Sequence, residues 1–460
     1  MRLRNTLLLA LVFLSLGAYL YFFELKKDPA GKGEKLLPFK EEEVDSLILS
    51  YPDQEIRIKK ESSGKWKITH PLEAAADEST VSDVLSALAA TDIERTIEKK
   101  PSAEDLQAFG LDNPKVKVSI ALHKAKTLPA VLVGAKTPVG NSSYVQRQSD
   151  PAVLLTHGSL PASLEKTLYD FRDKKIIEFK EQTVKRIALK GEKGDFVVIR
   201  KEPDWFLDQP KPYRADQAEV NAVLSTLRNM RAQDFVEEMP RDLKPYGLDK
   251  PRLRVGVSLG EKEGEREILF GDKRENKGEV YLVLDSKATV YTVSERIFQE
   301  LNKDLNTLRD KEIFPFPQDR VAQLHIQSPK ESFILVKGEK EGWMAEAPRR
   351  QKAQEGTVTA YLTTLGRIRA KGFAEGELKD LKRYGLNRPS LKISLGSHDG
   401  KNVATLLVGE RIGADYYAKR EDNPSVYTIE EFSYRQLNKQ SADFLGEETK
   451  DRSPAGGARK

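Results

Sequence analysis

The sequence predicts an α+β protein in which an N-terminal transmembrane helix precedes three tandem repeated units, each a mostly antiparallel sheet with packed helices. Three observations support this fold class. An uncharged apolar run occupies residues 6–23, uncommon residue types return at nearly constant spacing, and two-residue hydrophobic alternation gives way to helical spacing within each unit. At 460 residues, the chain is also too long for one compact core.

The N-terminal segment has the features of a membrane anchor. Residues 1–5 form a short basic end that we expect in the cytoplasm, and residues 6–23 would span about 27 Å as a helix. A cleaved signal peptide is the alternative, but its apolar region is usually about 7 to 15 residues long and ends in small side chains. Here the run ends in the aromatic cluster Tyr21–Phe23. We therefore predict an uncleaved anchor followed by a flexible stalk at residues 24–38.

Landmark residues then recur three times. The sequence numbers of successive tryptophans differ by 205 − 66 = 139 and by 343 − 205 = 138, and three Gly-Leu pairs recur with a proline four residues after each glycine. These repeat markers are Trp66, Trp205, Trp343, Gly110, Gly247, Gly385, Pro114, Pro251 and Pro389. The repeat units are predicted at residues 39–175, 176–313 and 314–448, before a disordered tail at residues 449–460.

Each unit is predicted to open with short strands and continue with a helix. Trp66 lies in one of these strands, where residues alternate between apolar and polar. Asp77 and Asp216 are expected to cap the helix, and Asp216 with Glu219 fits a capping box, whereas the third unit has Gln354 there. Apolar residues at helical spacing should pack on the sheet: Val81, Val84, Leu85 and Leu88; Val220, Val223, Leu224 and Leu227; Val358, Tyr361, Leu362 and Leu365.

The second half of each unit should be mostly strands. A short helix is predicted to end at the Gly-Leu pair, with the glycine in a left-handed turn, and the following proline restarts an extended chain. Four more strands follow, and a helix such as 164–171 or 297–308 closes the unit.

Composition excludes several classes of protein and of site. The chain has no cysteine, which removes disulfide scaffolds, thiolate zinc sites and cysteine nucleophiles. Its charge of 76 − 71 = +5 is small for a chain with 32% charged residues, so we expect no nucleic-acid partner.

Catalytic motifs are not evident. The histidines, His70, His123, His157, His325 and His398, do not recur between units and no pair has metal-binding helical spacing. The stretch 134–140 resembles a phosphate loop but lacks its Gly-Lys-Ser/Thr ending, so a turn between strands is favoured. We therefore predict no catalytic, cofactor or metal site and no enzymatic activity.

The repeat markers resemble a known bacterial family, the domain of unknown function DUF4340. The resemblance covers nearly all of residues 39–448 and rests on the apolar N-terminal run, Phe39, the stretch from Trp66 to Pro71, Asp77, the Gly110-Leu111 turn and Pro114. Gln354 departs from the pattern. Members are described as single-span envelope proteins encoded beside an ABC-type permease and a gliding-motility-type auxiliary subunit. The resemblance implies a protein of the bacterial inner membrane whose bulk is periplasmic and whose partners are envelope or transporter membrane proteins.

Three functions remain open from the sequence. The leading hypothesis is a non-enzymatic membrane-anchored scaffold or accessory subunit that contacts partner proteins. The second is a cell-wall or polysaccharide-binding protein that uses exposed aromatics such as Tyr144, Tyr281 and Tyr417. The third is a hydrolase with a site between units.

Overall fold

The structure is a computed structural model that describes residues 33–445, except residues 141, 157, 159, 261–263, 285–288, 348–349 and 375–379. The predicted anchor at residues 6–23 and the predicted tail at residues 449–460 lie outside this range. No helix in the described part of the chain combines the length and the apolar character needed to cross a membrane.

The chain divides into two compact units. The first contains the described residues up to Ile176 together with Arg231–Glu237. The second contains Ile177–Met230 and the described residues from Glu238 onward, and therefore includes most of the second repeat and all of the third.

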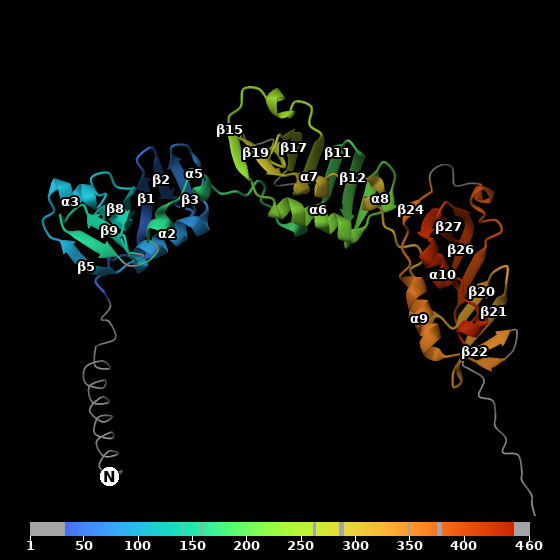
Figure 1. Cartoon of the computed structure of the whole chain (residues 1–460). Coiled ribbons are helices and arrows are strands. Elements are labelled where there is room, and N and C mark those ends of the chain that lie inside the picture. Colours follow the sequence, from blue (N-terminus) through green and yellow to red (C-terminus); the bar gives the residue numbers. More distant parts are fainter. Residues whose placement is uncertain are drawn as a thin grey trace, which may run out of the picture. The chain divides into compact units, whose positions relative to one another are not determined.

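Three sheets with one strand order confirm the predicted α+β repeats (Figure 1). The first runs β4 (Ala74–Ala75), β3 (Trp66–His70), β2 (Glu55–Lys60), β1 (Val44–Ser50), β6 (Val116–Leu122), β8 (Val131–Lys136), β9 (Ser143–Arg147), β10 (Val153–Thr156), β5 (Ile93–Glu98), and β7 (Lys126–Thr127) pairs with β6. The second runs β14 (Tyr213–Arg214), β13 (Asp204–Gln209), β12 (Gly194–Lys201), β11 (Arg186–Gly191), β16 (Leu253–Ser258), β17 (Glu265–Arg274), β18 (Glu279–Leu284), β19 (Thr289–Ser294), β15 (Asp234–Glu238). The third runs β23 (Gln351–Lys352), β22 (Gly342–Ala347), β21 (Ser332–Gly338), β20 (Gln323–Gln327), β25 (Leu391–Gly396), β26 (Asn402–Ile412), β27 (Asp415–Arg420), β28 (Tyr427–Glu430), β24 (Gly372–Phe373).

The central strand pair has the same register in all three sheets. Leu47 pairs with Ile120, Ile187 with Val257, and Leu324 with Leu395, in each case between antiparallel strands. The buried faces of these strands therefore correspond residue for residue.

One helix in each repeat lies against its sheet (Figure 1). These helices are α2 (Glu78–Ala90), α6 (Gln217–Asn229) and α9 (Glu355–Gly366). Their buried residues are the twelve that helical spacing predicted, which confirms the orientation of each helix. Because each helix follows one edge strand and precedes the strand at the opposite edge, it carries the chain across the whole sheet.

Two features differ from the predicted elements. The strands β5, β15 and β24 after the main helices were not predicted, because they contain no fully buried residue and so show no clear alternation. The closing helix is interrupted: α4 (Leu160–Leu164) and α5 (Leu168–Phe171), α7 (Glu295–Leu301) and α8 (Leu305–Leu308), and α10 (Glu431–Leu437) and η8 (Ser441–Asp443) replace it. A new N-cap starts the second piece in the first two repeats, at Thr167 and Asp304, so the helical pattern restarts there.

The first repeat begins earlier than the predicted boundary at residue 39. Leu36 and Leu37 belong to its hydrophobic core, and Lys35 forms a β-bridge with Asp92. Residues 35–37 therefore belong to the folded repeat, although the sequence analysis placed them in the stalk.

Candidate functional site

The three tryptophans have matching surroundings. Trp66, Trp205 and Trp343 are each at most 5% exposed, on the strand beside the short edge strand. The backbone N–H of Trp66 donates to Glu78 and that of Trp205 to Gln217, both at 2.8 Å. These contacts tie the strand to the first turn of the main helix, which is a structural role.

The Gly-Leu turns also have a structural role. Gly110, Gly247 and Gly385 have φ values of 64°, 65° and 66°, in the left-handed region that favours glycine. The following leucines are buried. A second repeated glycine lies close to the same turn, because a Cβ on Gly134, Gly271 or Gly409 would overlap the carbonyl oxygen of Phe109, Tyr246 or Tyr384, respectively.

The tyrosines considered for glycan binding are not exposed. Tyr144 packs on Phe109, Tyr281 on Tyr246 and Tyr417 on Tyr384, with ring centroids 4.5, 5.1 and 4.9 Å apart, and each is half-buried. The expectation of exposed sugar-stacking rings at these positions is therefore wrong, because each ring packs on an aromatic residue just before the Gly-Leu turn.

The junctions after the first and second repeats use an arginine stacked on an aromatic ring. In the first compact unit, the Arg172 guanidinium lies 3.6 Å from the ring centroid of Phe235, and the Tyr169 hydroxyl donates to the carbonyl oxygen of Ala232 at 3.1 Å. Arg172 is only 7% exposed. A guanidinium this buried loses contact with water, and the ring replaces part of that interaction.

The second compact unit repeats this contact one repeat later. Arg309 corresponds to Arg172 and Phe373 to Phe235, because 309 − 172 = 137 and 373 − 235 = 138, which match the spacing of the repeats. The Arg309 guanidinium is 3.8 Å from the ring centroids of both Phe373 and Tyr213, and it donates to the Ser425 hydroxyl at 2.6 Å. We call the contacts Arg172–Phe235 and Arg309–Phe373 the junction latches.

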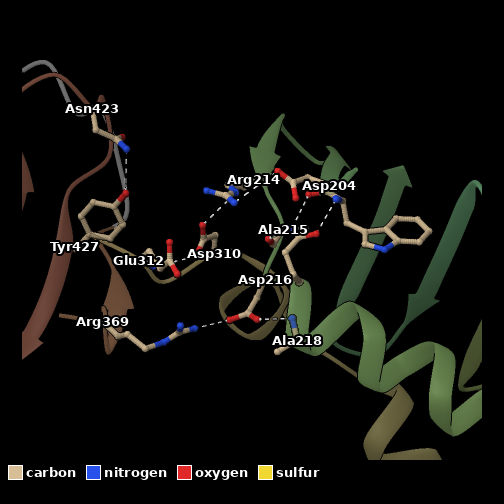
Figure 2. A network of polar contacts seen from close by, with 12 residues as sticks. Asp204, Arg214, Ala215, Asp216, Ala218, Asp310, Glu312, Arg369, Asn423 and Tyr427 are labelled. Carbon is tan, nitrogen blue, oxygen red and sulfur yellow. Dashed lines mark hydrogen bonds and ion pairs between the residues drawn. The ribbon is translucent and has the colours of Figure 1, made fainter. Parts of the chain in front are cut away.

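The second junction also contains ion pairs, some of which are drawn in Figure 2. Arg369 of the third repeat contacts the Asp216 carboxylate at 2.6 Å, and that carboxylate also accepts from the backbone N–H groups of Ala218 and Glu219 at the start of α6. Figure 2 shows Arg214 between two carboxylates, Asp204 and Asp310, both 3.6 Å from it. The N-cap of the second repeat is thus tied to the third repeat.

The caps differ among the three main helices. The Asp77 carboxylate accepts from the backbone N–H of Thr80, and Asp216 caps α6 as described above. The predicted capping box at Asp216 is wrong in its reciprocal half, because the Asp216 backbone N–H donates to Leu308 and the Glu219 carboxylate binds Lys303 instead. Gln354 forms no side-chain cap.

A cleft of about 420 Å³ opens beside the second latch. Arg214, Arg309, Asp310, Arg420 and Asp422 line it. Burial raises the pKa of the Asp310 carboxyl above its ordinary value and lowers the pKa of the Arg309 guanidinium. Arg420 is held by Asp422 at 2.6 Å. Arg214 pairs with Asp310 and Arg420 with Asp422, whereas Arg309 contacts two rings and the Ser425 hydroxyl, so the arrangement is suited to holding two repeats together.

No group of three or more carboxylate or imidazole side chains in the described part of the chain could hold a metal ion. His123 pairs with Asp45 through Nδ1 at 2.6 Å, and His325 contacts the Ser332 hydroxyl at 3.0 Å. His157 lies outside the described residues.

The sequence pointed to the arginine of each junction latch but not to its aromatic partner. The recurring Arg-Asp-Lys at residues 172–174 and 309–311 marked the junctions, but Phe235 and Phe373 were not singled out. Their signal was available, because both aromatics lie four residues after an arginine at equivalent positions.

Comparison with known proteins agrees with the three repeats. The family model described as "Domain of unknown function (DUF4340)" matches residues 66–205, 205–379 and 343–449, so each match starts at one of the repeated tryptophans. No curated protein and no solved structure matches the chain.

Proposed function

The chain belongs to the DUF4340 family, and on that premise we propose that it is a membrane-anchored extracytoplasmic scaffold, an accessory subunit of an ABC-type transporter-like envelope complex. It acts through contacts with envelope or transporter membrane proteins and has no enzymatic activity. The anchor is residues 6–23, and the folded repeats lie on the periplasmic side of the bacterial inner membrane.

One observation carries the proposal: the residues that recur in all three repeats have structural roles. In all three repeats the tryptophan is buried beside the short edge strand and the glycine forms a left-handed turn, and at the two junctions an arginine stacks on an aromatic ring. The repeated residues maintain the fold of each unit and are not a repeated set of reactive groups. This favours a protein that presents several contact surfaces on one chain.

A cysteine-labelling experiment tests the location. The chain contains no cysteine, so Val139→Cys places a single thiol at a side chain that is 89% exposed. A membrane-impermeant maleimide should label this variant in cells with a permeabilised outer membrane and an intact inner membrane. Labelling only after the inner membrane is broken would contradict the proposed topology.

Crosslinking in cells tests the partners. A photo-crosslinking residue at Met239 or Phe432, which are 79% and 67% exposed, should capture a permease or another envelope protein. The irradiated chain without a photo-crosslinking residue is the control and should capture none. Recovery of no envelope or transporter protein from either exposed position would overturn the proposal, and sedimentation of the chain with purified peptidoglycan would favour the glycan-binding alternative.

A further inference from the structure

An apolar cavity lies within the first repeat. It has a volume of about 280 Å³ and is lined by Tyr51, Val116, Val133, Pro161, Leu164 and Lys166, together with the aliphatic chain of Lys115. The Tyr51 hydroxyl donates to the carbonyl oxygen of Leu164 at 2.8 Å, which fixes the tyrosine as one wall. Burial raises the pKa of Tyr51 to about 12, so this wall stays uncharged.

The second repeat has aromatic rings at two of the corresponding positions. Phe298 corresponds to Pro161 and Phe270 to Val133, because 298 − 161 and 270 − 133 both equal 137. Phe298 is 1% exposed, and its ring centroid lies 6.1 Å from that of Phe270. The second repeat therefore supplies rings from its own chain at two positions where the first repeat has Pro161 and Val133.

The third repeat also places a ring there. Tyr434 corresponds to Phe298, since 434 − 298 = 136, and it stacks on Tyr416 with ring centroids 4.0 Å apart. Of the three corresponding positions, only the one in the first repeat has proline. An apolar cavity of about 150 Å³ is enough to hold a benzene ring, so the larger cavity of the first repeat can accept one aromatic side chain.

The charged residues around the cavity indicate which groups should accompany the aromatic side chain that binds there. In the second repeat, Arg252 lies over the Phe298 ring at 4.6 Å and pairs with Glu192 at 2.8 Å. Lys115 holds the position of Arg252 in the first repeat, since 252 − 115 = 137, and Lys166 is a second cation at the cavity. A ring accompanied by carboxylates would reproduce both contacts that the second repeat makes within itself.

We propose that this cavity is a socket for an aromatic side chain of a partner protein, with acidic residues beside that side chain. This inference rests on the proposed scaffold function and names one of its contact points. Glu165 also lines the cavity, so the two lysines leave its rim with a net positive charge. The socket residues are Tyr51, Val116, Val133, Pro161 and Leu164, with Lys115 and Lys166 recognising the acidic neighbours.

Peptide binding to the full chain in lipid nanodiscs tests the socket. The probe is acetyl-Glu-Phe-Glu-amide, observed through the methyl resonances of Val116, Val133 and Leu164. We expect these methyl resonances to shift, with a dissociation constant of about 1 mM, as suits a single buried ring. The peptide acetyl-Lys-Phe-Lys-amide should bind at least about threefold more weakly, because it repels both lysines.

Two variants make the test specific. Val133→Phe restores the ring found at Phe270 and should weaken peptide binding more than about tenfold, whereas the matched control Val139→Phe, at an 89% exposed position, should leave binding unchanged. Lys166→Glu leaves the apolar walls intact and should reverse the preference between the acidic and basic peptides, so the proposal stays testable even if Val133→Phe fails to fold.

Several results would overturn the socket. These are no methyl shift at about 10 mM peptide, unchanged binding by a folded Val133→Phe variant, shifts produced by octanoate but not by the peptide, or dimerisation of the parent chain that Val133→Phe abolishes. The last two would assign the cavity to a lipid chain or to a second copy. Envelope crosslinks from Met239 without peptide binding would remove only the socket, whereas peptide binding without such crosslinks would remove only the proposed transporter role.

Discussion

At the residue scale, the second junction depends on Arg309. Its guanidinium lies over the rings of both Tyr213 and Phe373, and it donates to the Ser425 hydroxyl. Lysine keeps the charge but lacks the planar group that both rings contact. The planar shape of the side chain therefore matters here as much as its charge.

Arg309→Ala should destabilise the second unit by about 2 kcal/mol, because a desolvated cation–π contact is lost. Arg309→Lys should recover only part of this loss. Urea unfolding with hydrogen exchange at the junction amides measures both effects. Arg296→Ala is the control, since its side chain is 83% exposed and its helix pair contributes about 0.3–0.5 kcal/mol. Equal stability of the Arg309 and Arg296 variants would contradict the latch.

Asp310 gives the junction a pH dependence with a defined sign. Because burial raises its pKa, the folded state favours the protonated carboxyl. The contribution of Asp310 to folding stability is complete below its unfolded-state pKa of about 3.9. It is lost as the pH rises through the pKa of Asp310 in the folded state. Asparagine does not ionise, so Asp310→Asn should not lose folding stability through this group. The variant should therefore become more stable relative to the parent as the pH rises from about 3. Parallel stability curves for the two proteins from about pH 3 to 7 would count against this prediction.

The N-terminus of α9 lacks a side-chain cap at Gln354. Gln354 forms no side-chain cap, whereas Asp77 accepts from the Thr80 backbone N–H at the equivalent position. Gln354→Asp should stabilise the third repeat by about 0.5–1 kcal/mol, and Gln354→Ala should change little. Thermal unfolding compares the two, and an unchanged or lowered melting temperature for Gln354→Asp would show that the aspartate does not cap α9.

At the element scale, the main helix holds each sheet in one piece. It crosses from one edge strand to the other, and in the first and third repeats its buried stripe belongs to the same hydrophobic cluster as the strands. Losing this contact would expose apolar side chains of the core to water.

Leu224→Asp should therefore unfold the middle repeat, at a cost above about 4 kcal/mol, since it removes a buried side chain and introduces a buried charge. Asn221→Asp, at an exposed position of the same helix, is the control. Limited proteolysis should cut the middle repeat of the first variant only. Resistance equal to that of the control would mean that the stripe is not the main contact.

At the scale of the whole molecule, the first and third repeats have hydrophobic cores of their own. One large buried cluster draws its members from Leu36 to Phe171 and another from Ile313 to Phe444. The contacts described at the junctions include cation–π pairs and ion pairs.

Calorimetry should accordingly record more than one unfolding transition, with a calorimetric enthalpy larger than the van't Hoff enthalpy. Arg309→Ala should separate the transitions further. A single two-state transition in both proteins would show that the repeats are coupled more strongly than these contacts explain.

The latch residues are absent from the two ends of the array. Corresponding β-bridges place Thr96 where the later repeats have Phe235 and Phe373, and Leu445 where the earlier repeats have Arg172 and Arg309. The described ends therefore lack the groups that join neighbouring repeats. A terminal repeat needs an outer surface that differs from the interior ones.

The sequence by itself determined the number of repeats, the helix stripes and the turn glycines. These are local properties: a stripe such as Val220 to Leu227 or a left-handed glycine such as Gly247 depends on residues within a few turns of chain. Because the repeats are regularly spaced, the same feature at equivalent positions in three repeats supported each of these predictions.

Only the tertiary structure decided which distant residues meet. The pairing of β5 beside β10, the stacking of Arg309 on Phe373 and the cavity beside Pro161 all join segments that are far apart in the chain. Hydrophobic periodicity indicates which side of an element is buried, but it does not indicate the partner against which that side packs, because the partner is set by strand order and by side-chain volume across the sheet.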